Sequence, residues 1–250
     1  MHRSFLILIT FLYIGFAEAQ FELPARETAS VARIISEEQA IAPGKPFTVA
    51  LQLEHPAGWH SYYQHSGGVE TPPAIQWMMP EGFSAGPIQW PVPEVKDGYF
   101  GKSFVYSGSP VFLVDITAPA RLEIGKTVTL TAHATWQICE TNCLDEKATI
   151  TLTLPVAAVD VRDAAQTGLF EMARKSLPLK IPSLTTTAQS DGGDIQLRIE
   201  PASAVAGTPA DFIPNQPFLN PASAGGTIRR DGDAWLIQLK RKKLDALEIP

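Results

Sequence analysis

Short stretches in which apolar and polar residues alternate are the feature that most limits how this chain can fold. They cover residues 46–54, 110–117, 126–136 and 147–154, and Gly, Pro, Asn or Asp fill the gaps between them. Alternation with a period of two residues is typical of strands that bury one face. Several such strands with no helical pattern between them predict an all-β antiparallel sandwich rather than a βαβ fold.

The remaining segments predict a second, smaller unit. Residues 162–176 lack proline, are rich in Ala, Glu, Lys and Arg, and stop at Leu177-Pro178, which predicts a short helix. Linker-like composition follows, and then two further strands are expected at residues 194–200 and 234–240. So small a unit is near the lower limit for independent folding. We therefore expect either that the chain is the N-terminal part of a longer polypeptide, or that the second unit is stabilised by packing on the first.

The predicted organisation therefore has four parts. Residues 1–19 form a signal peptide, 20–160 the sandwich domain, 161–190 a helix and linker, and 191–250 a second β-rich domain that looks incomplete. Residues 20–45 are expected to be an extended lead-in to the first strand.

The N-terminus predicts export. His2 and Arg3 precede an apolar run from Phe5 to Phe16, and Ala17-Glu18-Ala19 has small residues at the positions of a cleavage site. The run has about twelve residues, fewer than the roughly 20 that span a bilayer. A net charge of −6 and a pI near 5.4 disfavour nucleic acid as a partner.

Two cysteines, Cys139 and Cys143, make up the whole thiol inventory of the chain. They flank a three-residue loop between two predicted strands, a common hairpin length. Residues opposite one another across such a hairpin lie about 5.5 Å or less apart at Cα, within the range that a disulfide requires. An exported chain meets an oxidising compartment in which such a pair closes.

This disulfide could be a structural staple or an exchanging redox pair. Loop-entropy reasoning assigns so small a ring only about 2 kcal/mol, which favours exchange over stabilisation. Glu140, Asp145 and Glu146 are acidic neighbours and should raise the thiol pKa. A thiol that is mostly protonated exchanges slowly unless a docked partner activates or supplies the thiolate, which favours a relay module over a free oxidoreductase.

At these residues the sequence resembles the amino-terminal periplasmic domain of the DsbD thiol:disulfide interchange family, in its ScsB-like branch. The resemblance rests on the signal peptide and on GWHSYY at 58–63, IQWPVP at 88–93, YFGKS at 99–103 and the cysteine hairpin followed by residues 147–155. It covers residues 35–160 well and the second unit more weakly. The three-residue spacing of the cysteines is that expected of the ScsB-like branch.

The resemblance implies an immunoglobulin-like, periplasmic protein-disulfide reductase module without a cofactor. It would take reducing equivalents from a membrane-embedded thiol:disulfide donor and pass them to periplasmic thioredoxin-like proteins. Cys139 and Cys143 occupy the positions of the family's redox pair. Tyr99 and Phe100 match its cap loop, and His60 and Tyr62 fall in the segment that lines the site.

Two alternatives stay open from the sequence. One is an immunoglobulin-like binding adaptor with a purely structural disulfide. The other is a copper-handling protein, because His55, His60 and His65 recur every five residues and thiols add soft ligands. A period of five places successive histidines on opposite faces of a strand, so the three could not converge from one strand, and we expect no metal site.

Overall fold

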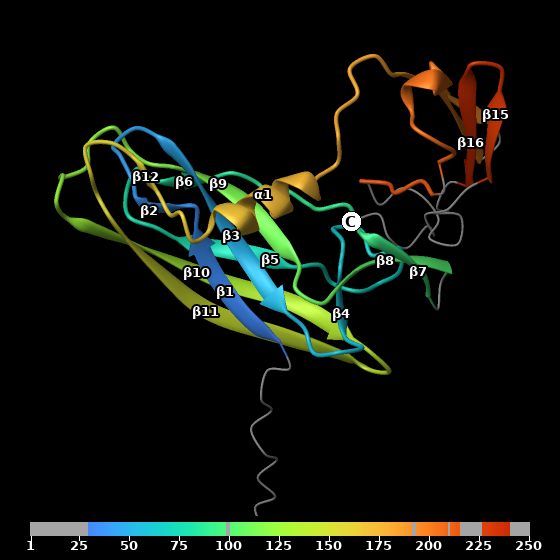
Figure 1. The fold of residues 1–250 in the computed structure, drawn as a ribbon. Helices are drawn as coiled ribbons and strands as arrows, with labels where there is room; N and C mark the ends of the chain where they lie inside the picture. The colour runs from blue at the N-terminus through green and yellow to red at the C-terminus, as the bar shows by residue number, and fades with distance from the viewer. Residues whose placement is uncertain (1–29, 99–100, 192–193, 210, 216–226, 241–250) are drawn as a thin grey trace, which may run out of the picture.

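The computed structural model describes residues 30–98, 101–191, 194–209, 211–215 and 227–240. The described chain is mostly strand and forms two groups of antiparallel sheets joined through one helix (Figure 1). The predicted signal peptide lies outside the described residues. No helix among those that are described is long and apolar enough to cross a bilayer.

The first group is a sandwich of two sheets. One sheet has the order β1 (Val31–Ser36), β3 (Pro46–Glu54), β9 (Val111–Thr117), β6 (Ser84–Ala85). The other has the order β11 (Cys143–Pro155), β10 (Thr127–Cys139), β4 (His60–Tyr62), β8 (Gly101–Ser107), β7 (Glu94–Gly98), and β5 (Ala74–Met78) also pairs with β10. A small pair joins β2 (Glu38–Ala40) to β12 (Val161–Arg162).

The core lies between these sheets and explains the alternation in the sequence. Every second residue of β9 and of β10 points inward. Large side chains of the core include Phe104 from β8, Phe112 from β9, and Leu130, Trp136 and Ile138 from β10. Trp59, Trp77 and Trp90, for which a core position was expected, are partly buried and pack against this core. Burial of one strand face drives the sheets together, and the predicted sandwich is confirmed.

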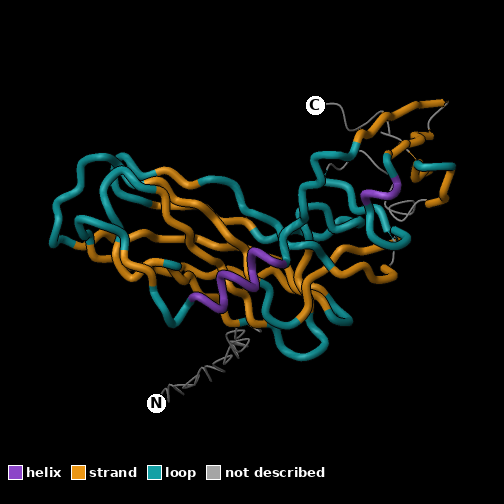
Figure 2. Tube along the Cα trace, turned by 45° about the horizontal axis from the view of Figure 1, so that its top comes forward, coloured by secondary structure: helices purple, strands orange, loops and turns teal. Residues whose placement is uncertain are grey.

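The helix α1 (Thr167–Lys175) covers the outer face of the first sheet, as Figure 2 also shows. Its Phe170 and Ala173 are buried against Ala50 of β3 and Leu113 of β9. It is shorter than the predicted 162–176. Residues 161–162 belong to β12, and the Asp163 side chain accepts a hydrogen bond from the Ala165 amide in the turn that precedes the helix.

The expected lead-in over residues 20–45 is wrong for residues 31–40, which form β1 and β2. In β1, Ile34 packs into the sandwich core, whereas its neighbour Ile35 packs under α1. The adjacent apolar residues Ile34 and Ile35 interrupt the period-two alternation, so this pattern could not reveal the strand.

The second group is a four-stranded sheet in the order β13 (Thr185–Asp191), β14 (Asp194–Glu200), β16 (Ala234–Lys240), β15 (Thr227–Asp231), with a 3-10 turn η1 (Ala202–Ala204). Strands β14 and β16 have the predicted bounds. Residues 211–215 connect the two groups. Phe212 packs on the second sheet, and Ile213 packs on the sandwich core. His65 also hydrogen-bonds the Asn215 carbonyl oxygen at 2.9 Å.

Candidate redox site

The two cysteines form a disulfide at the end of the longest hairpin of the sandwich. Strands β10 and β11 pair along their whole length, and the last pair in their register is Cys139 with Cys143. Their Cα atoms are 4.1 Å apart, as expected of residues directly opposite one another across an antiparallel ladder. The pairing predicted from the loop length is therefore present, and both strands run on to the cysteines, beyond the predicted 126–136 and 147–154.

The two sulfur-bearing residues differ in exposure. Cys139 is only 4% exposed and packs against Tyr62 and Val105, whereas Cys143 is exposed. Of the two residues of the disulfide, only Cys143 therefore presents much of its surface to solvent. Thiol:disulfide exchange requires access to the sulfur that is attacked.

The short strand β4 places two predicted site residues beside the disulfide. His60 pairs with Cys139 on one side and with Ser107 of β8 on the other. Tyr62 lies on the same face two residues later, and its hydroxyl is 3.3 Å from His60 Nε2. The two rings meet edge to face, with their centroids 5.3 Å apart. The structure thus brings His60, Tyr62 and both cysteines together.

The chain enters β4 through a turn that the cysteine loop covers. Gly58 has a φ of +89°, and a Cβ built on it would lie 2.7 Å from Glu140 Oε1. Only glycine adopts this backbone conformation without strain. A larger residue would also displace the flexible end of the Glu140 side chain, so the positive φ is the main reason for glycine at position 58.

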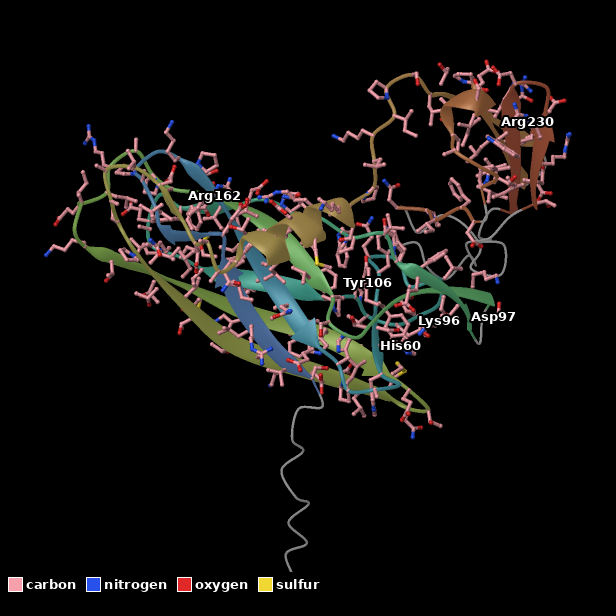
Figure 3. The ribbon with its side chains drawn as sticks, in the orientation of Figure 1. His60, Lys96, Asp97, Tyr106, Arg162 and Arg230 are labelled. Atoms are coloured by element: carbon pink, nitrogen blue, oxygen red, sulfur yellow. A yellow bond between two sulfur atoms is a disulfide. The ribbon has the colours of Figure 1, made fainter. Side chains whose placement is uncertain are left out.

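Lys96, Glu94 and Glu70 act electrostatically on His60, and Figure 3 labels His60 and Lys96 at the same end of the sandwich. Lys96 of β7 donates a hydrogen bond to Ser107 at 2.8 Å and lies 3.4 Å from Glu94. Burial lowers the pKa of His60, and the positive charge of Lys96 lowers it further, against the opposing effects of Glu94 and Glu70. The imidazole is therefore neutral at pH 7. Burial also raises the pKa of Tyr62 to about 12, so its hydroxyl keeps its proton.

A row of buried, hydrogen-bonded side chains, which the sequence did not reveal, lies beneath β4. His55 Nδ1 is 2.9 Å from Ser30 Oγ, and its Nε2 is 2.9 Å from Ser61 Oγ. Burial lowers the pKa of His55 to about 4, which outweighs the raising effect of Glu146. Ser61 is fully buried between the two site residues of β4. These bonds link the start of β1 and the end of β3 to β4, and only the tertiary structure makes them visible.

The three histidines of the copper alternative have separate partners. His55 hydrogen-bonds Ser30 in the buried row, His60 contacts Tyr62, and His65 hydrogen-bonds the backbone carbonyl oxygen of Asn215. Within the described ranges no group of three or more His, Cys, Asp or Glu side chains could hold a metal ion.

Tyr99 and Phe100, the predicted cap residues, lie outside the described residues. The strands β7 and β8 on either side of them pair as far as Gly98 and Gly101.

The fold and the site together define a β-sandwich protein with a hairpin disulfide on one sheet. The family model described as "Thiol:disulfide interchange protein DsbD, N-terminal" matches residues 31–155, which is half of the chain. This chain belongs to that family, and the resemblance found in the sequence is confirmed.

A solved structure supports the same fold. The N-terminal periplasmic domain of ScsB from Proteus mirabilis aligns with a TM-score of 0.62 at 13% identity, over 88% of this chain and 82% of that chain. The sporulation control protein Spo0M from Bacillus subtilis aligns with a TM-score of only 0.25 at 10% identity, over 69% of this chain and 79% of that one. At so low a score the second alignment carries no weight. A search of curated protein sequences finds no match.

Proposed function

We propose that this chain is a periplasmic thiol:disulfide interchange module in which Cys139 and Cys143 are the redox pair. The proposal extends the family assignment to a reaction and a compartment. The observation that carries it is the unequal exposure of the two cysteines, one accessible and one buried in the same disulfide. A staple needs neither cysteine to be accessible, whereas an exchanging pair needs one sulfur that a partner can reach.

The exposures assign a role to each cysteine. When the pair is reduced, the Cys143 thiolate attacks a disulfide of the partner and forms a mixed disulfide. Cys139 then attacks the Cys143 sulfur, the pair closes, and the partner leaves with two electrons as a dithiol. The same steps in reverse recharge the pair from a dithiol donor. Family membership supports thioredoxin-like acceptors and a membrane-embedded donor as the two partners.

Trapping tests this assignment directly. The Cys139→Ala variant, mixed with an oxidised thioredoxin-like protein, should accumulate a mixed disulfide through Cys143, visible on a non-reducing gel. The matched Cys143→Ala variant, whose remaining thiol is buried, should accumulate far less. Equal trapping by both variants would contradict the assigned roles, and no trapping by either would contradict the function.

The adaptor alternative predicts a different response to glutathione. Structural disulfides in secreted proteins resist reduction by a glutathione pool, whereas functional ones do not. Free thiols counted after mild glutathione treatment should therefore rise to two per chain if the pair is functional. A count that stays near zero would favour the structural staple.

A further inference from the structure

A short segment that follows η1 in the chain touches both groups of sheets. It comprises residues 211–215. Phe212 packs on the second sheet, whereas the next residue, Ile213, packs against the sandwich core. The backbone carbonyl oxygen of Asn215 accepts a hydrogen bond from His65 Nε2, with the two atoms 2.9 Å apart. The segment therefore joins the second unit to the sandwich through one apolar contact and one hydrogen bond.

The histidine in this contact belongs to a loop, residues 63–68, that is bonded to β8. The Tyr63 amide donates a hydrogen bond to the Phe104 carbonyl oxygen at 3.0 Å, and the Phe104 amide donates one to the Ser66 carbonyl oxygen at 2.8 Å. His65 lies between the two loop residues that make these bonds. A displacement of His65 would therefore strain or break the bonds between the loop and β8.

The strands on either side of this loop bury the inner cysteine. Tyr62 of β4 comes directly before the loop, and Val105 of β8 comes directly after Phe104. Both side chains are at most 4% exposed, and they form a cluster with Cys139. A continuous series of contacts therefore leads from the second unit to the side chains that cover Cys139.

We propose that residues 211–215 form a strap by which the second unit holds loop 63–68 against β8, and that this strap keeps Cys139 buried. The strap gives the second unit a role at the redox site that acts through the strands beside the disulfide. Its consequence for exchange rests on the proposed function: a partner would meet Cys143 first, and Cys139 would stay covered until the mixed disulfide has formed. The burial of Cys139 can be measured whether or not the chain exchanges disulfides.

Charges at the start of the strap favour the same docking. Lys102 Nζ of β8 lies 2.8 Å from Asp97 Oδ1 of β7. The hydrogen bond to Asp97 raises the pKa of Lys102, and the negative charge of Asp211 raises it further. Asp211 is therefore attracted to the strand that carries Val105. Because these charges are largely solvated, salt should screen the attraction, and the contacts of Ile213 and of the Asn215 carbonyl should matter more.

Two measurements on the full chain test the strap. The first follows alkylation of Cys139 by iodoacetamide in a Cys143→Ala background, in which Cys139 is the only thiol. The second follows hydrogen exchange of the Phe104 amide, which bonds the loop. Ile213→Ala should speed both reactions about 3- to 10-fold, because both report the population of the locally open form. His65→Ala should act in the same direction by a smaller factor, because its hydrogen bond is exposed to solvent.

Matched controls remove the same kinds of side chain elsewhere in the sandwich. Ile75→Ala truncates a partly buried isoleucine of β5 that also packs against the core. His133→Ala removes an exposed hydrogen bond between an imidazole of β10 and Thr149. Neither residue belongs to the strap or to the loop that it holds. Both controls should keep the alkylation and exchange rates of the Cys143→Ala background.

Three results would overturn the strap and leave the proposed function standing. The first is unchanged alkylation of Cys139 and unchanged exchange at Phe104 in both strap variants. The second is faster exchange at Phe104 without faster alkylation, because the loop would then move without uncovering the cysteine. The third is equal acceleration by Ile75→Ala and Ile213→Ala, because general loosening of the core would explain it.

The strap and the proposed function can fail separately. If the trapping experiment yields no mixed disulfide with either cysteine variant, the proposed function falls, while the alkylation and exchange rates still decide whether the strap covers Cys139. If Ile213→Ala does not fold, His65→Ala decides alone, since it removes a surface hydrogen bond. Faster alkylation and faster exchange in His65→Ala, with His133→Ala unchanged, would then support the strap, and unchanged rates would overturn it.

Discussion

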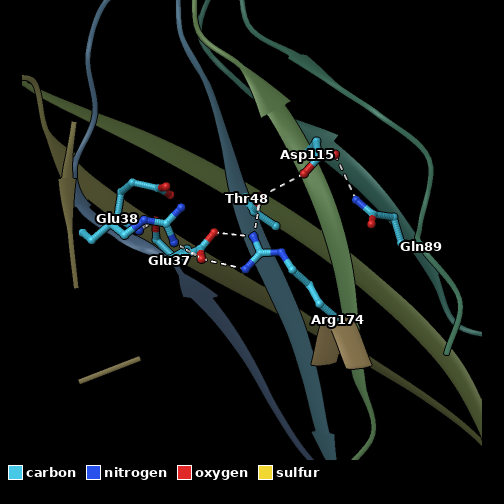
Figure 4. A network of polar contacts seen from close by, with 8 residues as sticks. Glu37, Glu38, Thr48, Gln89, Asp115 and Arg174 are labelled. Atoms are coloured by element: carbon cyan, nitrogen blue, oxygen red, sulfur yellow. Dashed lines mark hydrogen bonds and ion pairs between the residues drawn. The ribbon is translucent and has the colours of Figure 1, made fainter. Parts of the chain in front are cut away.

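Two clusters of the sandwich, the carboxylate of Glu37 with its arginines and the disulfide of the cysteine hairpin, differ in how far they are closed to solvent. Under α1, the Glu37 carboxylate is 4% exposed and accepts hydrogen bonds from Arg162 and Arg174 (Figure 4). Both carboxylate oxygens of Glu37 have arginine partners within the protein. At the cysteine hairpin, by contrast, Cys139 is buried and Cys143 is left accessible. In the first cluster Arg174 joins α1 to Glu37, and in the second one residue of the disulfide is buried while the other is exposed.

The largest effect should come from the cysteine cluster and should fall on activity alone. Cys143→Ala and Cys139→Ala should each abolish the transfer of electrons to a thioredoxin-like acceptor. The cost in stability should be no more than about 2 kcal/mol, because the ring closed by the disulfide is small. Insulin-coupled turnover and urea unfolding would measure the two quantities. If Cys139→Ala unfolds the sandwich, the disulfide is a stabilising contact like the Glu37 cluster, and the structural staple gains support.

The Glu37 cluster should show the reverse pattern. Glu37→Gln removes the charge of a nearly buried carboxylate that pairs with two arginines, and we expect the free energy of unfolding to fall by about 1–3 kcal/mol. The loss should be no larger, because both arginines are partly solvated. Electron transfer by the folded protein should be unchanged.

A matched surface pair provides the control for this effect. Arg33 and Glu54 lie 2.8 Å apart, but about half of each side chain is exposed. Glu54→Gln should therefore cost less than about 1 kcal/mol. If urea unfolding shows that Glu37→Gln and Glu54→Gln lower the free energy of unfolding equally, the Glu37 cluster stabilises the fold no more than a surface ion pair does.

The difference in the free energy of unfolding between the wild type and Glu37→Gln should depend on pH. Hydrogen bonds from Arg174 hold the pKa of Glu37 below its usual value of 4.5, against the opposing effect of burial. A lowered folded-state pKa gives stability that is present above pH 4.5 and is lost as the pH falls through the folded-state value. Unfolding free energies at pH 7, 5, 4 and 3 should show the gap between the two proteins closing at the acid end. Glu38, whose pKa burial raises, is present in both proteins and largely cancels.

The smallest expected effect concerns the cap that the resemblance predicts. Phe100→Ala should speed reduction of the disulfide by dithiothreitol a few-fold, because exchange depends on access to the sulfur. Its melting temperature should stay within a few degrees of the wild type. A core phenylalanine would instead cost about 3–5 kcal/mol. Phe112→Ala, at a fully buried site, gives that comparison in the same protein. An unchanged reduction rate would count against the cap.

The sequence by itself determined three strands whose bounds it predicts. Residues 46–54 of β3 and residues 194–200 and 234–240 of the second sheet match their predicted bounds. It also determined the cysteine pairing, because a three-residue hairpin loop brings its flanking residues face to face through local geometry alone. These features depend on side chains that are close in the chain, so their pattern is visible without the fold.

The tertiary structure alone decided the rest. The strand β1 shows no alternation because the core covers one face and α1 the other. The strand β4 is three residues long, and pairing on both sides places His60 beside Cys139. Which cysteine stays exposed depends on Tyr62 and Val105, far away in the sequence. Such placements result from contacts between residues distant along the chain, and no local periodicity records them.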